Sequence, residues 1–220
     1  SYLQEVTVEK ASKKKLVIFS VVGAVLGAVL GLAIVIIKTL LSDKIASEKD
    51  LRELGLDVLG TSDEILKIKA KIDHRLEDGI VGITSLASLD SYDFSDKLTK
   101  VLAENNGVLF VDSKNAADIE GKYQSQVEEF KVLRRGTIDY IAISKDDSEK
   151  ILDSNEFFSE IANKENSYNY IIIDEKNLDT ADPYLTARLC DMKIILVDEK
   201  TKKARLDQAI SDLRELVVGY

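Results

Sequence analysis

The sequence predicts an α/β protein in which one transmembrane helix precedes a mainly parallel β-sheet with helices on both faces. Three observations support this fold class. Residues 16–37 are uncharged and almost entirely apolar. Downstream, short β-branched runs alternate with amphipathic helical patterns, which is typical of strands buried between two helical layers. The length of 220 residues fits one domain of ordinary size plus a membrane segment.

The apolar run predicts a transmembrane helix over residues 16–41, preceded by an extracytoplasmic tail at residues 1–15. Its 22 uncharged residues, Leu16–Ile37, lie between lysines at both ends. At about 1.5 Å per residue such a helix spans the roughly 30 Å hydrocarbon core. The run is too long for a signal peptide, and no small-residue cleavage site follows it. Lysines balance on the two flanks, so charge alone does not set the orientation.

Glycines recur every four residues along the predicted membrane helix, at Gly23, Gly27 and Gly31. This spacing places them on one face, where a second helix can approach closely. Glycine is also simply common in membrane helices, but the strict spacing favours a packing face. The partner helix would come from another copy or from an earlier part of the same chain.

Residues 42–78 are predicted to form a linker that packs on the domain through Leu51, Leu54 and Leu56, followed by an amphipathic helix at Asp63–Glu77. The α/β domain then covers residues 79–220. Its predicted strands are Gly79–Thr84, Gly107–Val111, Thr137–Ile143, Tyr170–Asp174 and Met192–Val197. Its predicted helices are Phe94–Glu104, Glu156–Asn163, one ending at Thr186–Cys190, and Arg205–Val217.

Composition excludes several function classes. A net charge of −9 argues against a nucleic-acid partner, since phosphates repel an acidic surface. The single cysteine, Cys190, rules out an intrachain disulfide, and its apolar sequence neighbours indicate a buried, inert thiol. The only histidine, His74, fits a solvated helix surface better than a catalytic base. No zinc spacing or nucleophile elbow is present.

Two segments resemble known bacterial families. The apolar helix followed by LRELGLDVLGTS (Leu51–Ser62) resembles the junction in polysaccharide co-polymerases, the Wzz-type chain-length determinants of capsule and exopolysaccharide assembly. Residues Ile151–Asp174, ILDSNEFFSEIANKENSYNYIIID, are similar to a segment of the tyrosine kinases (BY-kinases, Wzc-type) fused to or paired with those proteins. The order of that family continues through Asp182 and ILVDEKT to the closing helix.

The resemblance implies a P-loop-like fold, with a phosphate-binding loop after the first strand and acidic residues after the second strand and at the end of YIIID. It also implies a cytoplasmic domain that assembles into a membrane-anchored ring. A phosphate-binding loop needs glycines, a lysine and a Ser/Thr hydroxyl. Here the loop has no glycine, and its first lysine is Lys97. The degenerate loop positions are Ser88, Asp90, Ser91, Tyr92 and Asp93.

The acidic residues in and after this loop predict repulsion of a bound triphosphate, in addition to the loss of its hydrogen bonds to the loop. Asp90, Asp93 and Asp96 would lie beside a bound triphosphate. One close like-charge pair costs roughly 1 kcal/mol in water and about 4 kcal/mol near a protein surface. We therefore expect no ATP binding, no cofactor and no catalytic residue.

The acidic positions that the resemblance implies are only partly kept. Asp112 follows the second strand, but Lys114 stands where the family has a further aspartate. Asp174 ends its strand, followed by Glu175-Lys176-Asn177 in place of prolines. Asp112 and Asp174 are read as strand-end residues that cap turns or helices. The alternative reading is a metal site used by an atypical phosphotransfer enzyme.

Together these expectations describe a non-catalytic scaffold in the cell membrane, with its C-terminal domain in the cytoplasm. The resemblance implies a role in capsular or exopolysaccharide chain-length control as a pseudokinase. Expected partners are further copies of the chain and a kinase, polymerase or export protein. A membrane-tethered signalling module unrelated to polysaccharide is a third reading, because one fold hosts many functions.

Overall fold

The computed structural model describes residues 43–218, except residues 46, 87–88, 115–129, 131 and 145. The predicted membrane helix and its glycines, Gly23, Gly27 and Gly31, lie outside the described residues, as does Ser88. By the contacts within the chain, the domain described below begins at Lys44. Within the described part, no helix is both long and apolar enough to cross a membrane.

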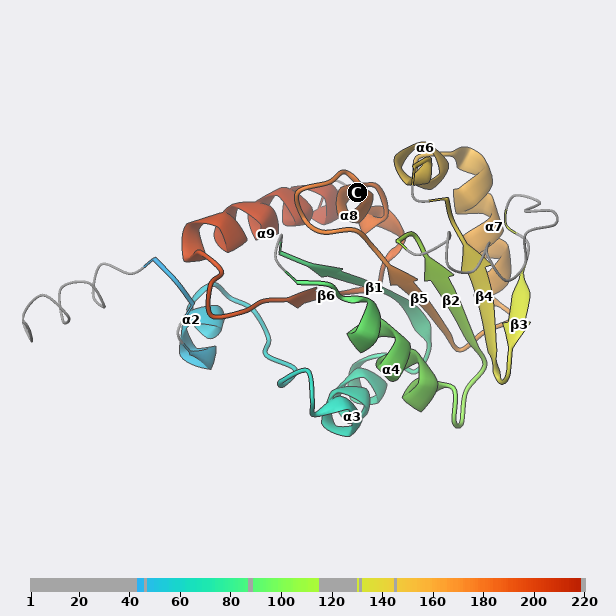
Figure 1. Cartoon of the computed structure of the whole chain (residues 1–220), viewed down its shortest axis with the longest axis horizontal. Helices are drawn as coiled ribbons and strands as arrows, with labels where there is room; N and C mark the ends of the chain where they lie inside the picture. The colour runs from blue at the N-terminus through green and yellow to red at the C-terminus, as the bar shows by residue number, and fades with distance from the viewer. Residues whose placement is uncertain are drawn as a thin grey trace, which may run out of the picture. The chain divides into compact units, whose positions relative to one another are not determined.

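A six-stranded sheet forms the centre of the domain, in the order β3-β4-β2-β5-β1-β6 (Figure 1). Every neighbouring pair is parallel except β3 and β4. The strands are β1 Gly79–Ser85, β2 Val108–Asp112, β3 Leu133–Arg135, β4 Ile138–Ala142, β5 Tyr170–Asp174 and β6 Met192–Leu196. The α/β class, the mainly parallel sheet and the five predicted strands are therefore confirmed.

Strand β3 was not predicted. It has only three residues, two of them arginines, and it pairs antiparallel with β4 through a turn at Gly136. Gly136 has φ 66°, a left-handed conformation that glycine adopts without strain. A short charged edge strand carries no hydrophobic periodicity, and for that reason the sequence pattern did not reveal it.

The helices lie on both faces of the sheet (Figure 1). They are α2 Glu48–Glu53, α3 Ile65–Arg75, α4 Tyr92–Leu102, α6 Ser148–Leu152, α7 Asn155–Glu165, α8 Asp182–Leu185 and α9 Lys203–Val218, with a 3-10 turn at Ala187–Leu189. The longer predicted helices are confirmed within a few residues. The short helix α6 was missed, and the helix predicted to end at Thr186–Cys190 is instead the separate short segments α8 and Ala187–Leu189.

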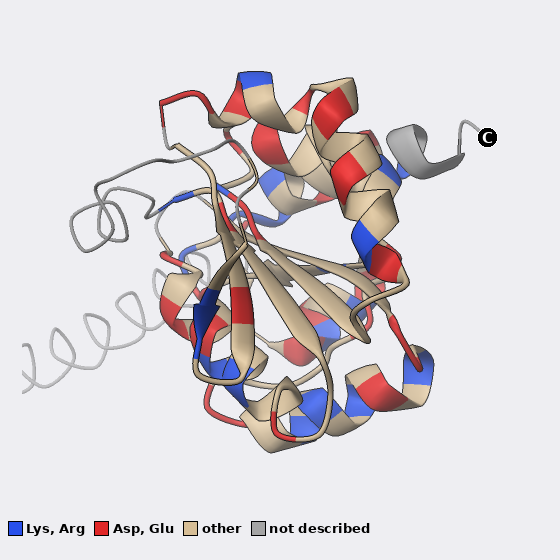
Figure 2. Cartoon of the chain, turned by 90° about the vertical axis from the view of Figure 1, so that its right-hand side faces the viewer, with Lys and Arg blue, Asp and Glu red and all other residues tan. Residues whose placement is uncertain are grey.

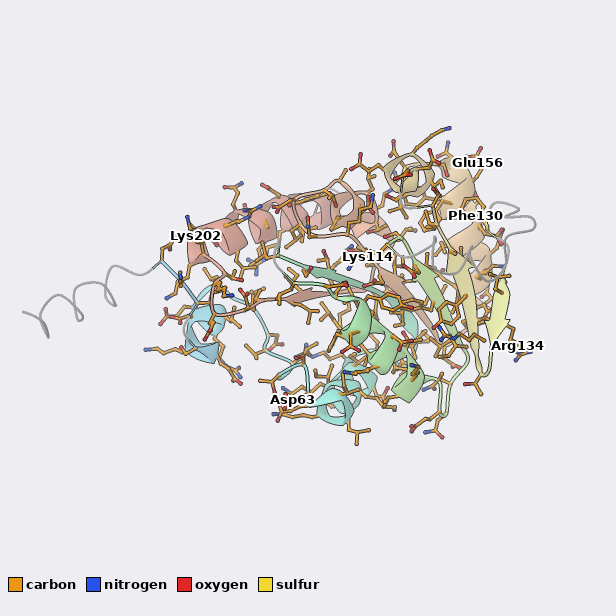
Figure 3. All side chains as sticks on the ribbon, viewed as in Figure 1. Asp63, Lys114, Phe130, Arg134, Glu156 and Lys202 are labelled. Atoms are coloured by element: carbon orange, nitrogen blue, oxygen red, sulfur yellow. The ribbon has the colours of Figure 1, made fainter. Side chains whose placement is uncertain are left out.

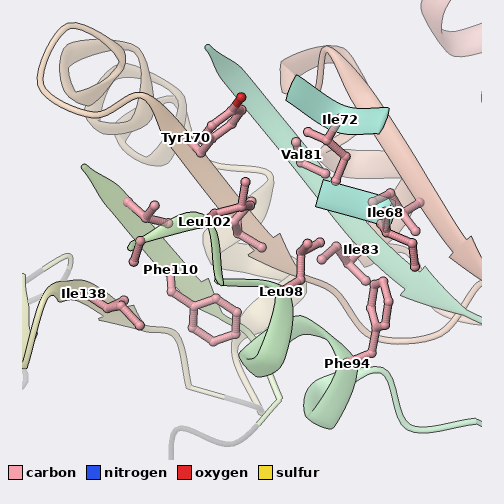
Figure 4. Packing of buried hydrophobic residues seen from close by; sticks show 14 of the residues in the cluster. Ile68, Ile72, Val81, Ile83, Phe94, Leu98, Leu102, Phe110, Ile138 and Tyr170 are labelled. Atoms are coloured by element: carbon pink, nitrogen blue, oxygen red, sulfur yellow. The ribbon is translucent and has the colours of Figure 1, made fainter. Parts of the chain in front are cut away.

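The strands are apolar because both of their faces are covered. Helices α3 and α4 pack on one face, where Ile72, Leu98 and Leu102 are fully buried against β1 and β2 (Figure 4). Helix α7 packs on the other face through Phe157 and Ile161. Charged residues are concentrated on the helices and at the sheet edges, and the central strands carry few of them (Figure 2).

The linker is part of the domain, as its leucines predicted. Leu51, Leu54 and Leu56 pack against the buried residues of α9. Ile45 is 6% exposed, and its backbone N–H donates to Thr201 O over 3.0 Å. Lys203 forms an ion pair with Asp50, which also caps the first turn of α2. Residues 44–56 are therefore anchored to α9 and to the turn before it.

Candidate functional site: the carboxyl edge of the sheet

The carboxyl ends of β2 and β5 bring two aspartates together. Asp112 and Asp174 are the last residues of these strands and are direct partners in the parallel register. Both are fully buried. In open α/β sheets this edge is where ligands bind, so the two carboxylates occupy the position expected for a functional site.

Three donors converge on one oxygen of Asp174. The hydroxyls of Ser91 and Ser95 each donate to Asp174 Oδ1 over 2.7 Å. Lys114 Nζ lies 3.3 Å from the same oxygen and also contacts Ser91 Oγ. The lysine side chain is 14% exposed and extends from the end of β2, where Figure 3 labels it. The carboxylate is thus occupied by side chains of the protein itself.

Burial raises the pKa of the Asp174 carboxyl. The Lys114 ammonium and the two serine hydroxyls act in the opposite direction, because they stabilise the ionised form. Asp174 Oδ2 is buried and has no hydrogen-bond partner among the described residues. The charge of Asp174 therefore depends mainly on Lys114.

Asp112 has a local role as well as its place beside Asp174. Its Oδ1 accepts a hydrogen bond of 2.8 Å from the backbone N–H of Lys114. This bond closes the turn that follows β2 and directs the chain so that the Lys114 side chain reaches Asp174. Ser113 lies between them, and its hydroxyl donates to Asp174 O over 2.8 Å.

The loop that the sequence predicts to be a degenerate phosphate-binding loop leads into α4. Asp90 Oδ1 accepts from the Tyr92 backbone N–H over 3.0 Å. Ser91 precedes the helix, yet its hydroxyl is directed to Asp174 and makes no helix-capping bond. The Tyr92 ring meets the buried Phe110 ring edge-on, with centroids 6.2 Å apart. Ser91 and Tyr92 of the predicted degenerate loop therefore pack inward on β5 and β2, whereas Asp90 and Asp93 are exposed.

One part of the expected repulsion needs correction. Asp93 is 79% exposed and forms an ion pair with Lys97 one turn later. Asp96 forms the same type of pair with Lys100. Because lysines of α4 offset both charges, these two acids would repel a triphosphate less than the sequence suggested.

A second buried ion pair lies beside the first. Glu175, the residue after β5, is fully buried and pairs with Lys193 of β6. Thr186 Oγ1 donates to the same Glu175 oxygen over 2.5 Å. Burial raises the pKa of Glu175, and Lys193 opposes that effect. The pair ties the end of β5 to the edge strand β6.

Cys190 is partly buried and packs against the apolar cluster that includes Phe157 and Ile161, as its apolar sequence neighbours indicated. Cys190 Sγ lies 4.0 Å from Glu175 Oε1 and is therefore next to the buried ion pair. Burial raises the pKa of the Cys190 thiol to about 12, which keeps it protonated at neutral pH. His74 lies exposed on α3, as expected.

Asp182 is a fourth buried carboxylate at this edge, and it gives the site a testable pH dependence. Its Oδ1 accepts from Ser148 Oγ over 3.2 Å, and burial raises its pKa above the ordinary value of 3.8. A carboxyl group with a raised pKa stabilises the fold below its ordinary pKa, and this contribution is lost as the pH rises through the raised value. We expect Asp182→Asn to gain stability relative to the wild type as the pH rises above the ordinary pKa of 3.8.

Thermal unfolding at a series of pH values measures this difference. Asp153→Asn, which changes an exposed carboxylate in the turn after α6, is the matched control. Parallel stability curves for the wild type and Asp182→Asn would contradict the assignment.

A metal or nucleotide would find few free ligands at this edge. Among the described residues, no group of three or more His, Cys, Asp or Glu side chains could hold a metal ion. Hard cations such as Mg²⁺ need several oxygen ligands. Of the two Asp174 oxygens, Oδ1 already has three donors around it, and Oδ2 has no hydrogen-bond partner among the described residues.

Comparison with solved structures identifies the fold. The chain is similar to the VpsO kinase domain, with TM-score 0.59 and 18% identity over 78% of this chain and 93% of that one. It is similar to the kinase domain of the Escherichia coli tyrosine kinase ETK, with TM-score 0.59 and 13% identity over 70% and 71%. The chimerical protein CapA2B2 gives TM-score 0.61 and 16% identity over 77% and 93%. The domain has the fold of bacterial tyrosine kinase domains.

These likenesses are structural. No family model matches the chain, and neither does any curated protein sequence. A plasmid partition protein from Borrelia burgdorferi shares the fold with TM-score 0.51 and 20% identity, over 64% of this chain and 76% of that one. Since one fold serves proteins with such different names, function has to be argued from the site.

Sequence reasoning found the two aspartates and the altered loop, but not their connections. It did not assign any role to Ser95, Glu175 or Lys193, and it treated Lys114 only as a missing acid. The one feature of the sequence that could have indicated the role of Lys114 is its position two residues after Asp112, the aspartate at the end of β2. The sequence gives no direct indication that its side chain reaches the end of another strand.

Proposed function

We propose that this protein is a non-catalytic, membrane-anchored regulator or scaffold in capsular or exopolysaccharide biosynthesis and export, with a pseudokinase domain that does not bind ATP. The observation that carries the proposal is the occupation of Asp174 by Lys114, Ser91 and Ser95. The resemblance to chain-length determinants supports the pathway, and the fold of bacterial tyrosine kinase domains agrees with it.

Electrostatics explains why the occupied site opposes nucleotide binding. The Lys114 ammonium lies 3.3 Å from Asp174 Oδ1, in the space that a magnesium ion bound to this oxygen and its other ligands would need. A divalent cation brought to the same carboxylate would meet a positive charge in a poorly solvated place. Without the metal, the buried Asp112 and Asp174 would repel the phosphates. Displacing Lys114 would leave Asp174 without its main counter-charge.

The scaffold part of the proposal concerns partners and location. The membrane helix would hold the domain at the cytoplasmic face of the cell membrane, and Gly23, Gly27 and Gly31 would pack against another helix. Partners would be further copies of the chain and a kinase or a polysaccharide polymerase or export protein. The altered loop leaves the fold intact, and a preserved fold whose Asp174 is occupied by the protein's own side chains suits protein contact.

Calorimetry tests the absence of nucleotide binding. Titrating the full chain in detergent with Mg-ATP should give no binding heat up to about 1 mM, a range that covers ordinary KM values. The same titration of Lys114→Asp asks whether lysine is the obstacle. Micromolar binding by the wild-type chain would end the pseudokinase proposal.

An enzyme is the second candidate, because one observation favours it. Asp112 and Asp174 are side by side, and Asp174 Oδ2 has no hydrogen-bond partner among the described residues. A metal-dependent phosphotransfer enzyme would use this pair. In that case nucleotide or Mn²⁺ binding would be measurable and Asp174→Asn would abolish it, whereas the scaffold proposal expects no binding in either chain.

A further inference from the structure

The outer edge of β6 has unpaired backbone groups. This strand is the last in the sheet order, next to β1 only. Leu196 O accepts from the Leu86 N–H over 3.2 Å, so its carbonyl faces the β1 side. Because backbone groups alternate along a strand, those of Ile195 and Val197 face outward. No backbone hydrogen bond from these two residues to another segment is found within the described part of the chain.

A groove runs along this edge. Its cavity has a volume of about 420 Å³. Strand β6 and the residues after it form one wall, and residues 56–62 of the connection between α2 and α3 form another. Figure 1 shows this connection passing beside β6. Apolar side chains line the interior, among them Leu51, Leu56, Leu59, Ile195 and Val197.

The rim of the groove is acidic. Glu48, Asp57, Asp198 and Glu199 line it together with one lysine, Lys193. Glu48 and Asp57 form ion pairs with Arg52 and Arg75, and the Lys193 ammonium is held by the buried Glu175. Four lining acids against these two arginines still leave the groove with a net negative charge. An occupant with positive charge is therefore favoured.

We propose that this groove binds an extended, basic peptide segment of a partner protein, which adds to the sheet as a strand beside β6. Three features fit this occupant. Open backbone groups supply hydrogen bonds, the apolar interior accepts alternate side chains, and the acidic rim attracts lysine or arginine. With a wall on each side, the groove admits a single chain rather than the edge of another folded sheet. This binding does not depend on the closed ATP site.

Defined peptides test the proposal on the full chain in zwitterionic phosphatidylcholine nanodiscs. The probe is a fluorescent seven-residue peptide of alternating lysine and valine, with binding followed by anisotropy and empty nanodiscs as the blank. Two matched peptides separate the contributions. One carries N-methyl groups on alternate amides, which removes edge hydrogen bonds, and the other has glutamate in place of lysine.

We expect the lysine peptide to bind, and the N-methylated peptide to bind about thirtyfold more weakly, because two hydrogen bonds of about 1 kcal/mol each are lost. The glutamate peptide should not bind. Glu199→Lys should weaken the lysine peptide about fivefold at low salt, since it reverses one rim charge. Glu156→Lys, a charge reversal on α7 away from the groove, should have no effect.

Four results would overturn the proposal. In the first, the lysine peptide fails to bind, and in the second the N-methylated peptide binds as tightly as the lysine peptide. In the third, Glu156→Lys weakens binding as much as Glu199→Lys. In the fourth, a fatty acid displaces the lysine peptide when no unlabelled peptide does, which would make the groove a lipid site. Circular dichroism confirms that each variant is folded. A failed Glu199→Lys variant would be replaced by Glu48→Gln, which also lies at the rim.

Discussion

Replacing Lys114 with methionine is expected to lower the free energy of unfolding by about 3 kcal/mol. Methionine keeps most of the volume of the lysine stem but removes the charge that faces Asp174. A buried carboxylate then retains only the hydroxyls of Ser91 and Ser95. Removing one partner of a buried pair is costly because the other charge stays desolvated. Urea unfolding of the full chain in one detergent, followed by circular dichroism, measures the loss.

A second substitution separates the charge pair from packing. In Lys114→Met/Asp174→Asn, the asparagine oxygen can still accept from both serines, and neither member of the former pair is left charged. The double variant should therefore recover most of the stability. Lys97→Met is the control, because its ion pair with Asp93 is exposed and should contribute less than about 0.5 kcal/mol. A double variant as unstable as the single one would show that Lys114 acts through packing alone.

The fold was largely readable from the sequence because the buried strands are continuous apolar runs. Tyr170–Asp174 and Val108–Asp112 are buried at every position, so hydrophobicity alone marks them. The edges were harder to predict. Strand β3 is exposed and basic, and α8 has only four residues. Short, half-exposed elements are set by their neighbours in space, and a local pattern does not record them.

The site could be predicted in part for a similar reason. The absence of glycine and lysine between β1 and α4 is visible in the sequence, and so are the acids that end the strands. The new partners are not visible. Ser91 and Asp174 are 83 residues apart and Lys114 and Asp174 are 60 apart, so only the strand order joins them. A parallel sheet brings such distant strand ends together, and its order has to be known first.

Replacing Lys193 with methionine is expected to cost more than the change at Lys114, about 4 kcal/mol. Glu175 is fully buried, and apart from Lys193 it accepts from the Thr186 hydroxyl over 2.5 Å. Its second oxygen, Oε2, has no hydrogen-bond partner in the described part of the chain. Asp174 keeps two hydroxyl donors after loss of its lysine, whereas Glu175 keeps one hydroxyl donor and the weaker thiol donor of Cys190. Weaker remaining donors leave the buried charge less stabilised.

The cost should depend on pH in a definite direction. Burial raises the pKa of Glu175, and without Lys193 that pKa rises further. Protonation then relieves the unpaired charge, so Lys193→Met should destabilise less at about pH 5 than at about pH 8. The control is Lys202→Met, an exposed lysine just before α9, which should change stability little at either pH.

The space around Gly82 decides whether a neutral pair of side chains can replace the Lys193–Glu175 ion pair. A Cβ atom at Gly82 would lie 2.7 Å from Glu175 Oε1 and 2.9 Å from Lys193 Cδ, so the pair fills the room that glycine leaves. Lys193→Met/Glu175→Gln keeps nearly this volume without charge and should regain most of the lost stability. Urea unfolding of the wild type, both single variants and the double variant at both pH values gives the coupling energy. A coupling near zero would mean that packing around Gly82, and not the ion pair, joins β6 to the end of β5.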